Sequence, residues 1–243
     1  MSAIRPRPSR LGALNCCLLL SSATSALHAQ PEILNYKVEW RLIQAGIARI
    51  TFDKSLNASQ GRLDIQSQGL VSKLFRVNDV YEVNWHAGYC AQSAHMLAEE
   101  GSRRRETNIL FAGPATQYTE KDLVKNTSTQ KSVPVPACVE DVLGGLQKLR
   151  TLKLTPGTTA QLPITDGKKF VDVRVEIQEK ETIITPVGTF KTVRIEPFLF
   201  NGVMYERNAR CFVWITDDEK RTPVMFQVRM RFHIGNITFT LDK

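Results

Sequence analysis

The sequence has few of the residues and runs by which enzymes and membrane proteins are recognised. It contains 5 Cys and 4 His in 243 residues, and no apolar run beyond residue 30 is long enough to span a bilayer. It also lacks G-x-S-x-G, HExxH and the glycine loops that hold phosphate. These absences argue against a polytopic membrane protein and leave no signature of a serine hydrolase, a zinc hydrolase or a nucleotide-binding enzyme.

The remaining candidates for catalysis are isolated. His86, His95 and His233 stand far apart in the sequence, so only folding could gather them, and a single strand histidine is usually a surface or satisfied core residue. The densest acidic cluster is Asp217-Asp218-Glu219. It could hold Ca²⁺ or share acid–base work. We favour the polar tip of a hairpin, because Asp bonds its own backbone in such turns, and we predict no metal and no cofactor.

Residues 1–29 have the three-part pattern of a secretory signal peptide. Three arginines lie within the first ten residues, an apolar run follows over residues 11–20, and small residues lead to Ala29. A retained membrane anchor is the alternative, although Asn15 interrupts the run. A lipoprotein fits less well, because the leucine run follows the first two cysteines. We expect cleavage near Ala29, a periplasmic or secreted protein, and no transmembrane segment in residues 30–243.

Basic residues outnumber acidic ones only mildly. The formal net charge is +8, and loss of residues 1–29 would remove three arginines and no acid, leaving +5. A nucleic-acid binder concentrates a larger excess on one face. The densest basic run, Arg103-Arg104-Arg105, is flanked by three glutamates. We interpret it as a solvated hairpin edge of the kind that discourages aggregation between sheets, and expect no nucleic-acid partner.

Export would leave three cysteines, enough for one disulfide and one free thiol. We favour Cys90–Cys138, because Cys90 follows a Gly-Tyr turn and Cys138 lies in a proline-rich approach to a helix, where the backbone can adapt. Cys211 lies in a predicted strand, the usual setting of a buried inert thiol. Three reduced thiols are the alternative. No two of the three form a CxxC pair, which argues against a redox enzyme.

Apolar and polar residues alternate over most of the chain after residue 30. Leu34, Tyr36, Val38 and Trp40 share one face, with polar residues between them, which is the period of a half-buried antiparallel strand. Segments with this pattern recur to the C-terminus, and turn-forming residues separate them. It predicts an all-β, mainly antiparallel fold of roughly a dozen strands, either a sandwich or a half-open barrel. No shift in composition divides residues 30–243, so we expect a single β-rich domain there.

One segment has the helical period instead. Apolar residues recur at spacings of three and four from Val139 to Leu149, with acidic residues before them and basic residues at the end, which suits the helix dipole. Gly144-Gly145 in the middle costs about 1 kcal/mol per residue relative to alanine. This cost indicates close packing of the helix backbone against the sheet. Residues 70–75 could form a second, short helical turn.

The order of several short motifs resembles a known family. The motifs are Ala137-Cys138-Val139-Glu140-Asp141-Val142, Pro156-Gly157, Thr185-Pro186-Val187-Gly188-Thr189-Phe190, Trp214-Ile215-Thr216-Asp217-Asp218 and Arg221-Thr222-Pro223-Val224. From about Leu34 to Leu241 the chain resembles the exported bacterial family called domain of unknown function 3108. The resemblance implies a β-rich cell-envelope protein of Gram-negative bacteria. The family has no assigned activity, so no catalytic residue is implied.

Two hypotheses of function from different classes remain, with a third behind them. The first is a non-catalytic protein that binds an apolar or amphipathic, lipid-like ligand, since Trp40, Trp85 and Trp214 lie at strand positions that could face a cleft. The alternative for each tryptophan is that it fills the core. The second hypothesis is a structural or assembly factor that binds an envelope protein by strand addition at a sheet edge or at residues 125–136. A hydrolase built on the histidines is the weakest.

Overall fold

Strands supply almost all of the regular structure. The computed structural model describes residues 30–54, 59–199, 209–230 and 235–242. The strands are β1 (Glu32–Trp40), β2 (Ile43–Lys54), β3 (Ser59–Ser67), β4 (Val77–Trp85), β5 (Ala91–Glu100), β6 (Arg103–Ala112), β7 (Ala115–Asp122), β8 (Thr127–Pro134), β9 (Thr159–Thr165), β10 (Phe170–Thr185), β11 (Gly188–Pro197), β12 (Arg210–Thr216), β13 (Pro223–Arg229) and β14 (Asn236–Leu241). The helices are α1 (Gly69–Leu74), α2 (Val142–Thr151) and the 3₁₀ turn η1 (Ala87–Tyr89).

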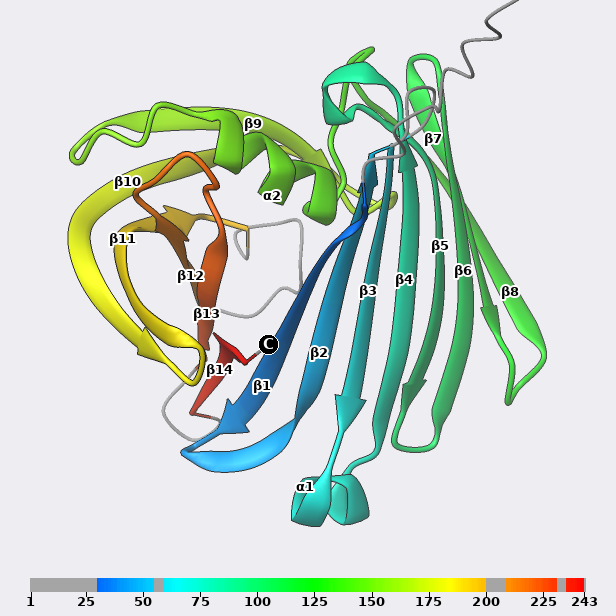
Figure 1. Ribbon diagram of the computed structural model, residues 1–243. Helices are drawn as coiled ribbons and strands as arrows, with labels where there is room; N and C mark the ends of the chain where they lie inside the picture. The colour runs from blue at the N-terminus through cyan, green and yellow to red at the C-terminus, as the bar shows by residue number, and fades with distance from the viewer. Residues whose placement is uncertain (1–29, 55–58, 200–208, 231–234, 243) are drawn as a thin grey trace, which may run out of the picture.

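All of these strands belong to one antiparallel sheet with the order β8-β7-β6-β5-β4-β3-β2-β1-β14-β13-β12-β11-β10-β9. The chain begins in the middle of the sheet, runs outward to the edge strand β8, crosses through α2 to the other edge strand β9, and returns strand by strand to β1 (Figure 1). The predicted all-β fold is confirmed, with 14 strands rather than a dozen, in an open sheet.

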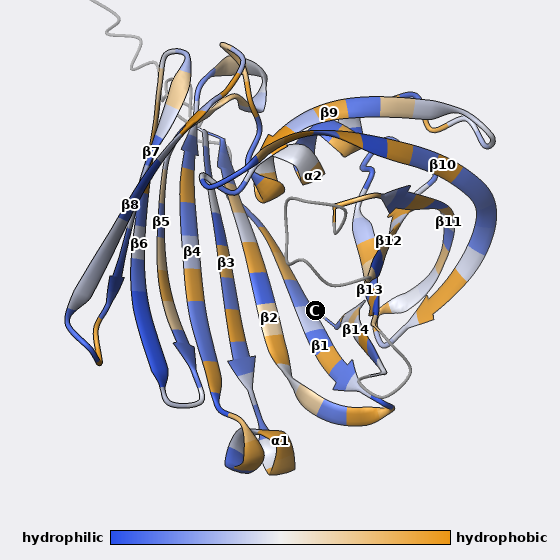
Figure 2. Cartoon of the chain, turned by 180° about the vertical axis from the view of Figure 1, so that it is seen from behind, coloured by the Kyte–Doolittle hydropathy of each residue, from blue (hydrophilic) through white to orange (hydrophobic). Residues whose placement is uncertain are grey.

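The sheet curls around α2, and its concave face carries the core (Figure 1). Residues alternate along the strands between hydrophobic and hydrophilic, as the banding in Figure 2 shows. On β1, for example, Leu34, Tyr36 and Val38 are buried while their neighbours are not. Because successive side chains of a strand point to opposite faces, this period selects one face of the sheet for burial.

Helix α2 begins at Val142, about one turn later than the sequence pattern predicts. Val139 is buried but not helical. Glu140 continues the edge of the sheet instead, forming a parallel bridge with Ile164 of β9. Asp141 has an extended conformation, with φ −81° and ψ −178°, and is the N-cap. The apolar residues therefore keep helical spacing back to Val139, but the chain before Val142 is not helical, and the backbone of Glu140 forms its hydrogen bonds with β9.

Gly144 and Gly145 let the backbone of α2 lie close to the sheet, as the energetic cost of two glycines inside a helix predicts. A Cβ atom on Gly145 would lie 2.6 Å from Cδ1 of Ile164. One on Gly144 would lie 2.9 Å from the indole nitrogen of Trp85 and 2.8 Å from a carboxylate oxygen of Asp141. Neither position can hold a larger side chain without moving its neighbours, so both glycines are needed for the helix to rest on β4 and β9.

The carboxylate of Asp141 holds the start of α2 on the sheet. One of its oxygens accepts hydrogen bonds from Trp85 Nε1 at 2.6 Å and from the amide of Gly144 at 2.9 Å. The other accepts from the hydroxyl of Tyr81 at 3.0 Å and from the amide of Leu143 at 2.9 Å. Burial raises the pKa of Asp141, and these four donors act in the opposite direction. The side chain thus caps the helix and joins it to β4.

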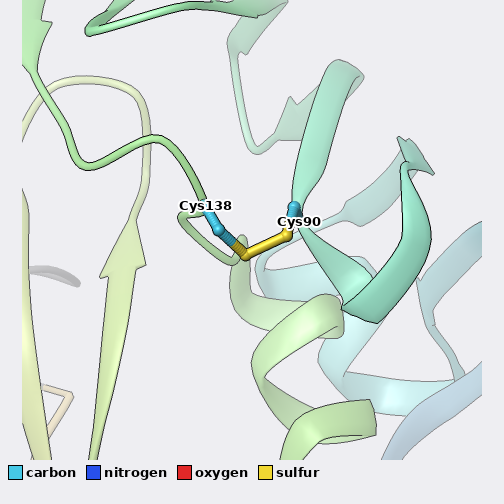
Figure 3. Close-up of a disulfide and its surroundings, with 2 residues drawn as sticks. All are labelled: Cys90 and Cys138. Atoms are coloured by element: carbon cyan, nitrogen blue, oxygen red, sulfur yellow. A yellow bond between two sulfur atoms is a disulfide. The ribbon is translucent and has the colours of Figure 1, made fainter.

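A disulfide between Cys90 and Cys138 makes a second tie close by, and it is the pairing that the sequence favours (Figure 3). It connects the end of the β4–β5 turn to the segment that leads into α2. The backbone supports the same contact, because the amide of Ala91 donates to the carbonyl of Val139 at 2.8 Å. Cys211 is a buried free thiol, as predicted.

The arginine run does not lie on a sheet edge, so that part of the prediction is wrong. Arg103-Arg104-Arg105 opens β6, which lies between β5 and β7. Arg105 forms ion pairs with Glu100 and Glu120 of these two neighbours. The run is at a hairpin end, as its flanking glutamates suggest, but the pattern of charges cannot distinguish an inner hairpin from an outer one. The short helix predicted over residues 70–75 is present as α1.

Loss of the disulfide should destabilise the protein substantially. The Cys90→Ser/Cys138→Ser double variant frees a loop with a sequence separation of 48 residues, and the loop-entropy model gives a loss of about 4 kcal/mol in the free energy of unfolding. Urea unfolding monitored by circular dichroism measures the change, with Cys211→Ala as the control. A peptide map that links Cys211 to either partner, or a double variant as stable as the native chain, would contradict the pairing.

Removal of the Asp141 carboxylate should be at least as damaging as loss of an ordinary helix cap. In Asp141→Ala the indole of Trp85 and the hydroxyl of Tyr81 lose a buried acceptor, so we expect a loss of about 3 kcal/mol or more in the free energy of unfolding. Asp122→Ala is the matched control, because Asp122 also accepts two backbone amides but in an exposed turn. Similar losses in the two variants would refute the special role of Asp141.

Candidate functional site

An apolar cavity of about 190 Å³ lies between α2 and the concave face of the sheet. Its walls come from both halves of the sheet and from the helix. The lining residues are Tyr36, Ala48, Ile50, Leu63, Ile65, Val142, Leu143, Gly145, Leu146, Leu149, Leu162, Ile164, Pro197, Leu199, Cys211, Val213, Phe226, Val228 and Phe239. All of these side chains are apolar except the hydroxyl of Tyr36 and the thiol of Cys211.

The strand period explains why these residues meet. Cys211 and Val213 are two positions apart on β12 and face Val228 and Phe226, their register partners on β13. Ala48 and Ile50 of β2 likewise face Ile65 and Leu63 of β3. Alternate residues of neighbouring strands therefore form continuous apolar rows on one face. The apolar face of α2 covers these rows, and the space that remains between them is the cavity.

The walls differ in how far they are buried. The side chains from β9 and β12 and the leucines of α2 are almost completely buried, for example Leu143, Leu162 and Val213. Ile65 on β3 and Phe239 on β14 are half-buried. Val142 of α2, Leu63 of β3 and Phe226 and Val228 of β13 are half-buried as well.

Among the described residues, the cavity lining offers no group for acid–base or nucleophilic chemistry. The hydroxyl of Tyr36 donates to the carbonyl of Pro223 at 2.7 Å, so its hydrogen is already used. Burial raises the pKa of the Cys211 thiol to about 12, which leaves it protonated and a poor nucleophile. What this cavity can do chemically is remove hydrocarbon from water.

The tryptophans that motivated a ligand cleft do not line it. Trp85 is 4 % exposed and its indole nitrogen donates to Asp141. Trp214 is 3 % exposed and donates to Glu181 at 3.0 Å, on the face of β12 opposite the cavity. Trp40 is half-buried at the end of β1, with the guanidinium of Arg41 5.6 Å from its ring centroid. The core-filling interpretation is therefore correct for Trp85 and Trp214. The aromatic walls of the cavity are Tyr36, Phe226 and Phe239 instead.

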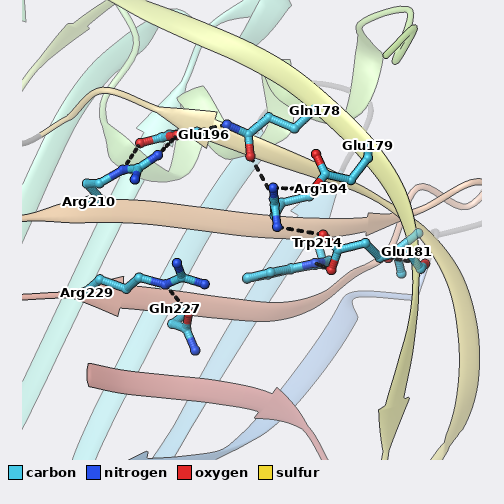
Figure 4. Close-up of polar contacts among 10 residues, drawn as sticks. Gln178, Glu179, Glu181, Arg194, Glu196, Arg210, Trp214, Gln227 and Arg229 are labelled. Atoms are coloured by element: carbon cyan, nitrogen blue, oxygen red, sulfur yellow. Dashed lines mark hydrogen bonds and ion pairs between the residues drawn. The ribbon is translucent and has the colours of Figure 1, made fainter. Parts of the chain in front are cut away.

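The outer face behind this wall is covered by a network of ion pairs (Figure 4). Arg210 donates twice to Glu196, at 2.6 and 2.7 Å. Burial alone would raise the pKa of Glu196, but the hydrogen bonds and the charge of Arg210 lower it. The guanidinium groups of Arg210, Arg194 and Arg229 lie 4.9, 5.7 and 4.5 Å from the ring centroid of Phe212. Paired charges and stacked arginine stems thus shield the second face of β10–β13 from water.

The predicted polar sites are accounted for by local structure. His95 pairs with Glu106 at 3.2 Å on a half-exposed surface, His86 is exposed, and His233 lies outside the described residues. The acidic cluster forms the β12–β13 turn, as predicted. Asp217 pairs with Lys180 at 2.5 Å, and Asp218 accepts from Thr216 and from the amides of residues 220 and 221.

Two searches of the described part of the chain give negative results. No three His, Cys, Asp or Glu side chains are grouped there as metal ligands would be. No helix there has the length and hydropathy needed to cross a membrane.

The fold is similar to that of one solved protein from a family of unknown function. No curated protein matches the chain. The chain is similar to the crystal structure of a beta-barrel-like protein of domain of unknown function DUF1849 from Brucella abortus, with 9 % identity, a TM-score of 0.59, and coverage of 87 % of this chain and 95 % of that one. A DUF1089 family protein from Pseudomonas aeruginosa has 8 % identity, a TM-score of 0.30, and coverage of 78 % and 86 %. At these identities the first likeness shows the fold alone, and the second carries no argument.

The family model is more informative, because it spans nearly the whole described chain. The model described as "Protein of unknown function (DUF3108)" matches residues 35–242. This range contains every strand from β2 to β14 and all of α2. It also agrees with the resemblance that the order of the sequence motifs indicates. The chain belongs to the DUF3108 family.

Proposed function

We propose that this protein binds the apolar part of an amphipathic ligand in the cavity beneath α2, without catalysing a reaction. The observation that carries the proposal is the composition of the cavity wall. A space of about 190 Å³ is lined almost entirely by hydrocarbon and aromatic side chains, nearly all of them from eight strands and α2. Pockets for small molecules are typically concave, mostly apolar and largely preformed, and this cavity has those properties.

The size of the cavity limits what enters it. Apolar cavities of about 150 Å³ accept benzene, whereas drug-sized ligands occupy about 300–1,000 Å³. A volume of about 190 Å³ therefore suits a segment of one hydrocarbon chain or a small ring rather than a whole lipid. The polar part of such a ligand would remain near the half-buried lining residues, among them Ile65 and Phe239. An amphipathic ligand meets both conditions.

The cell envelope is the proposed location. Residues 1–29 have the composition of a secretory signal, and a stable disulfide is typical of proteins that act in an oxidising compartment. Membership in DUF3108 is compatible with export. The signal peptide, its cleavage near Ala29 and a single domain over residues 30–243 remain predictions.

Filling the cavity should abolish ligand binding. In Ile65→Trp the larger side chain starts from a half-buried wall position on β3 and extends into the cavity. We expect at least a tenfold loss of affinity for a fluorescent fatty acid added to delipidated protein, with the far-ultraviolet circular dichroism spectrum unchanged. For the unmodified protein, affinity should rise about fourfold for each added methylene until the cavity is full, because each buried methylene contributes about 0.8 kcal/mol.

Ile47→Trp is the matched control for this experiment. Ile47 lies on the neighbouring strand β2, is 41 % exposed, and pairs in register with Gln66 rather than Ile65. It therefore points to the outer face, and the same substitution should leave affinity unchanged. Equal effects of the two variants, or affinity independent of chain length, would contradict a binding site in the cavity.

A second function, assembly through strand addition, is supported by the unequal edges of the sheet. β8 is an edge strand, seven of its eight residues are exposed, and it pairs only with β7. The opposite edge strand β9 is partly covered, because Glu140 donates to Pro163 and accepts from Thr165. An uncovered edge presents backbone donors and acceptors to an extended partner segment. β8 lies within residues 125–136, where the sequence analysis expects a protein contact.

Site-specific photo-crosslinking in the native envelope tests this second function. A photoreactive residue at Gln130 in β8 should yield one discrete cross-linked protein if the edge binds a partner. The same residue at Lys191, which is exposed on the inner strand β11, should yield none. A cross-link pattern that is the same from both positions would argue against strand addition.

A further inference from the structure

One end of the first eight strands carries an unusual set of exposed side chains. Because β1–β8 form an antiparallel meander, the connections after β1, β3, β5 and β7 all lie at the same end, the lower one in Figure 1. We call residues 41–43, 68–76, 101–104 and 123–126 the α1 end, after the helix in its second segment. Neighbouring strands lie about 4.8 Å apart, so this row of connections extends over about 34 Å.

Large apolar side chains gather at the α1 end. Seven of the thirteen exposed large hydrophobic residues in the described chain belong to it. They are Leu42 (93 % exposed), Ile43 (53 %), Leu70 (62 %), Leu74 (73 %), Phe75 (53 %), Leu123 (45 %) and Val124 (61 %). Helix α1 buries none of its residues. An exposed apolar set of this kind marks an interaction surface rather than part of the core.

The same segments carry only positive charge. They contain six basic residues, namely Arg41, Lys73, Arg76, Arg103, Arg104 and Lys125, and no Asp or Glu. Three carboxylates border these segments. Asp122 accepts from the amides of Val124 and Lys125, both at 2.9 Å. Glu99 is 3.8 Å from Arg76 and 4.0 Å from Arg104, and Glu100 pairs with Arg105. Lys73 and Arg103 therefore stand with the exposed apolar residues as solvated cations at the tips of the connections, and Lys125 lies beside Asp122.

The two described connections between strands at the opposite end have neither property. These connections, residues 86–90 and 113–114, contain no Lys or Arg and no exposed large hydrophobic residue. The two ends are built from connections of the same sheet, so chain geometry does not explain the difference. The difference lies in the side chains that each end presents to its surroundings.

We propose that the α1 end docks on the surface of an anionic lipid bilayer. The exposed leucine, isoleucine, valine and phenylalanine side chains enter the interface between headgroups and acyl chains, while the six cations contact anionic headgroups. The apolar residues project from separate turns along a row of about 34 Å. A bilayer accepts such separate projections, whereas a protein partner requires a contiguous, closely packed patch. This binding is independent of the cavity beneath α2.

Vesicle flotation tests the proposal on the purified protein. We expect binding to vesicles of phosphatidylglycerol and phosphatidylethanolamine, weak binding to pure phosphatidylcholine, and a decrease as salt is raised. Lys73→Glu/Arg103→Glu should weaken binding to the anionic vesicles by more than about tenfold. Leu70→Ser/Leu74→Ser should weaken binding to a similar extent by removing the inserted groups.

Matched controls come from exposed positions elsewhere in the chain. Ile184→Ser/Val187→Ser removes two exposed apolar side chains, 79 % and 44 % exposed, from the β10–β11 turn. Lys153→Glu/Lys191→Glu reverses two exposed charges outside the α1 end. Both should bind as the unmodified protein does. Residues 1–29 are common to all variants, so any difference among variants reports on the substituted surface.

These experiments distinguish membrane docking at the α1 end from ligand binding in the cavity. Ile65→Trp should lose ligand affinity and still bind vesicles, whereas the α1-end variants should do the reverse. Absence of binding to anionic vesicles would overturn the proposal. Binding that the α1-end variants and the controls reduce equally would overturn it as well, because the surface would then have no special part.

Discussion

The fold depends on one buried carboxylate. An open sheet of this length has an apolar concave face that must be covered, and among the described residues one helix of ten residues, α2, covers it. That helix has two glycines in its centre and little intrinsic stability. Asp141 compensates by capping its first turn while accepting hydrogen bonds from Trp85 and Tyr81 of β4. The Cys90–Cys138 disulfide and the bridge between Glu140 and Ile164 secure the same short segment.

The cavity follows from this arrangement. Gly145 brings the backbone of α2 against Ile164 of β9, so the helix sits close to one side of the curved sheet. Its leucines, Leu143, Leu146 and Leu149, then reach the facing strands without filling all the space before them. A helix held at three points at its start cannot move to close the gap. The same contacts that stabilise the fold therefore preserve an apolar space that a hydrocarbon chain can occupy.

The sequence predicts the class of fold and several contacts, and misses the relation between distant segments. Period-two alternation identifies strands such as β1 because burial on one face is a local pattern, and the glycine pair of α2 indicates close packing because its cost must be offset. The same patterns cannot show that β1 pairs with β14, that Arg103 opens an inner strand, or that Val139 lies outside the helix. Trp85 shows why the sequence could not locate the site. An aromatic residue at a strand position fits a cleft wall or a core equally well, and only the structure shows that Trp85 is in the core, hydrogen-bonded to Asp141. The residues that line the cavity are ordinary core residues in sequence, since the gap among them results from how α2 is held.

The central claim is that the space beneath α2 holds the apolar part of an amphipathic ligand. Native mass spectrometry of the protein, purified gently from its own envelope, tests this most directly. The account predicts a discrete added mass that disappears after organic extraction and is absent from Ile65→Trp, while Ile47→Trp retains it. Bare protein under the gentlest conditions, or an added mass that Ile65→Trp retains, would contradict it.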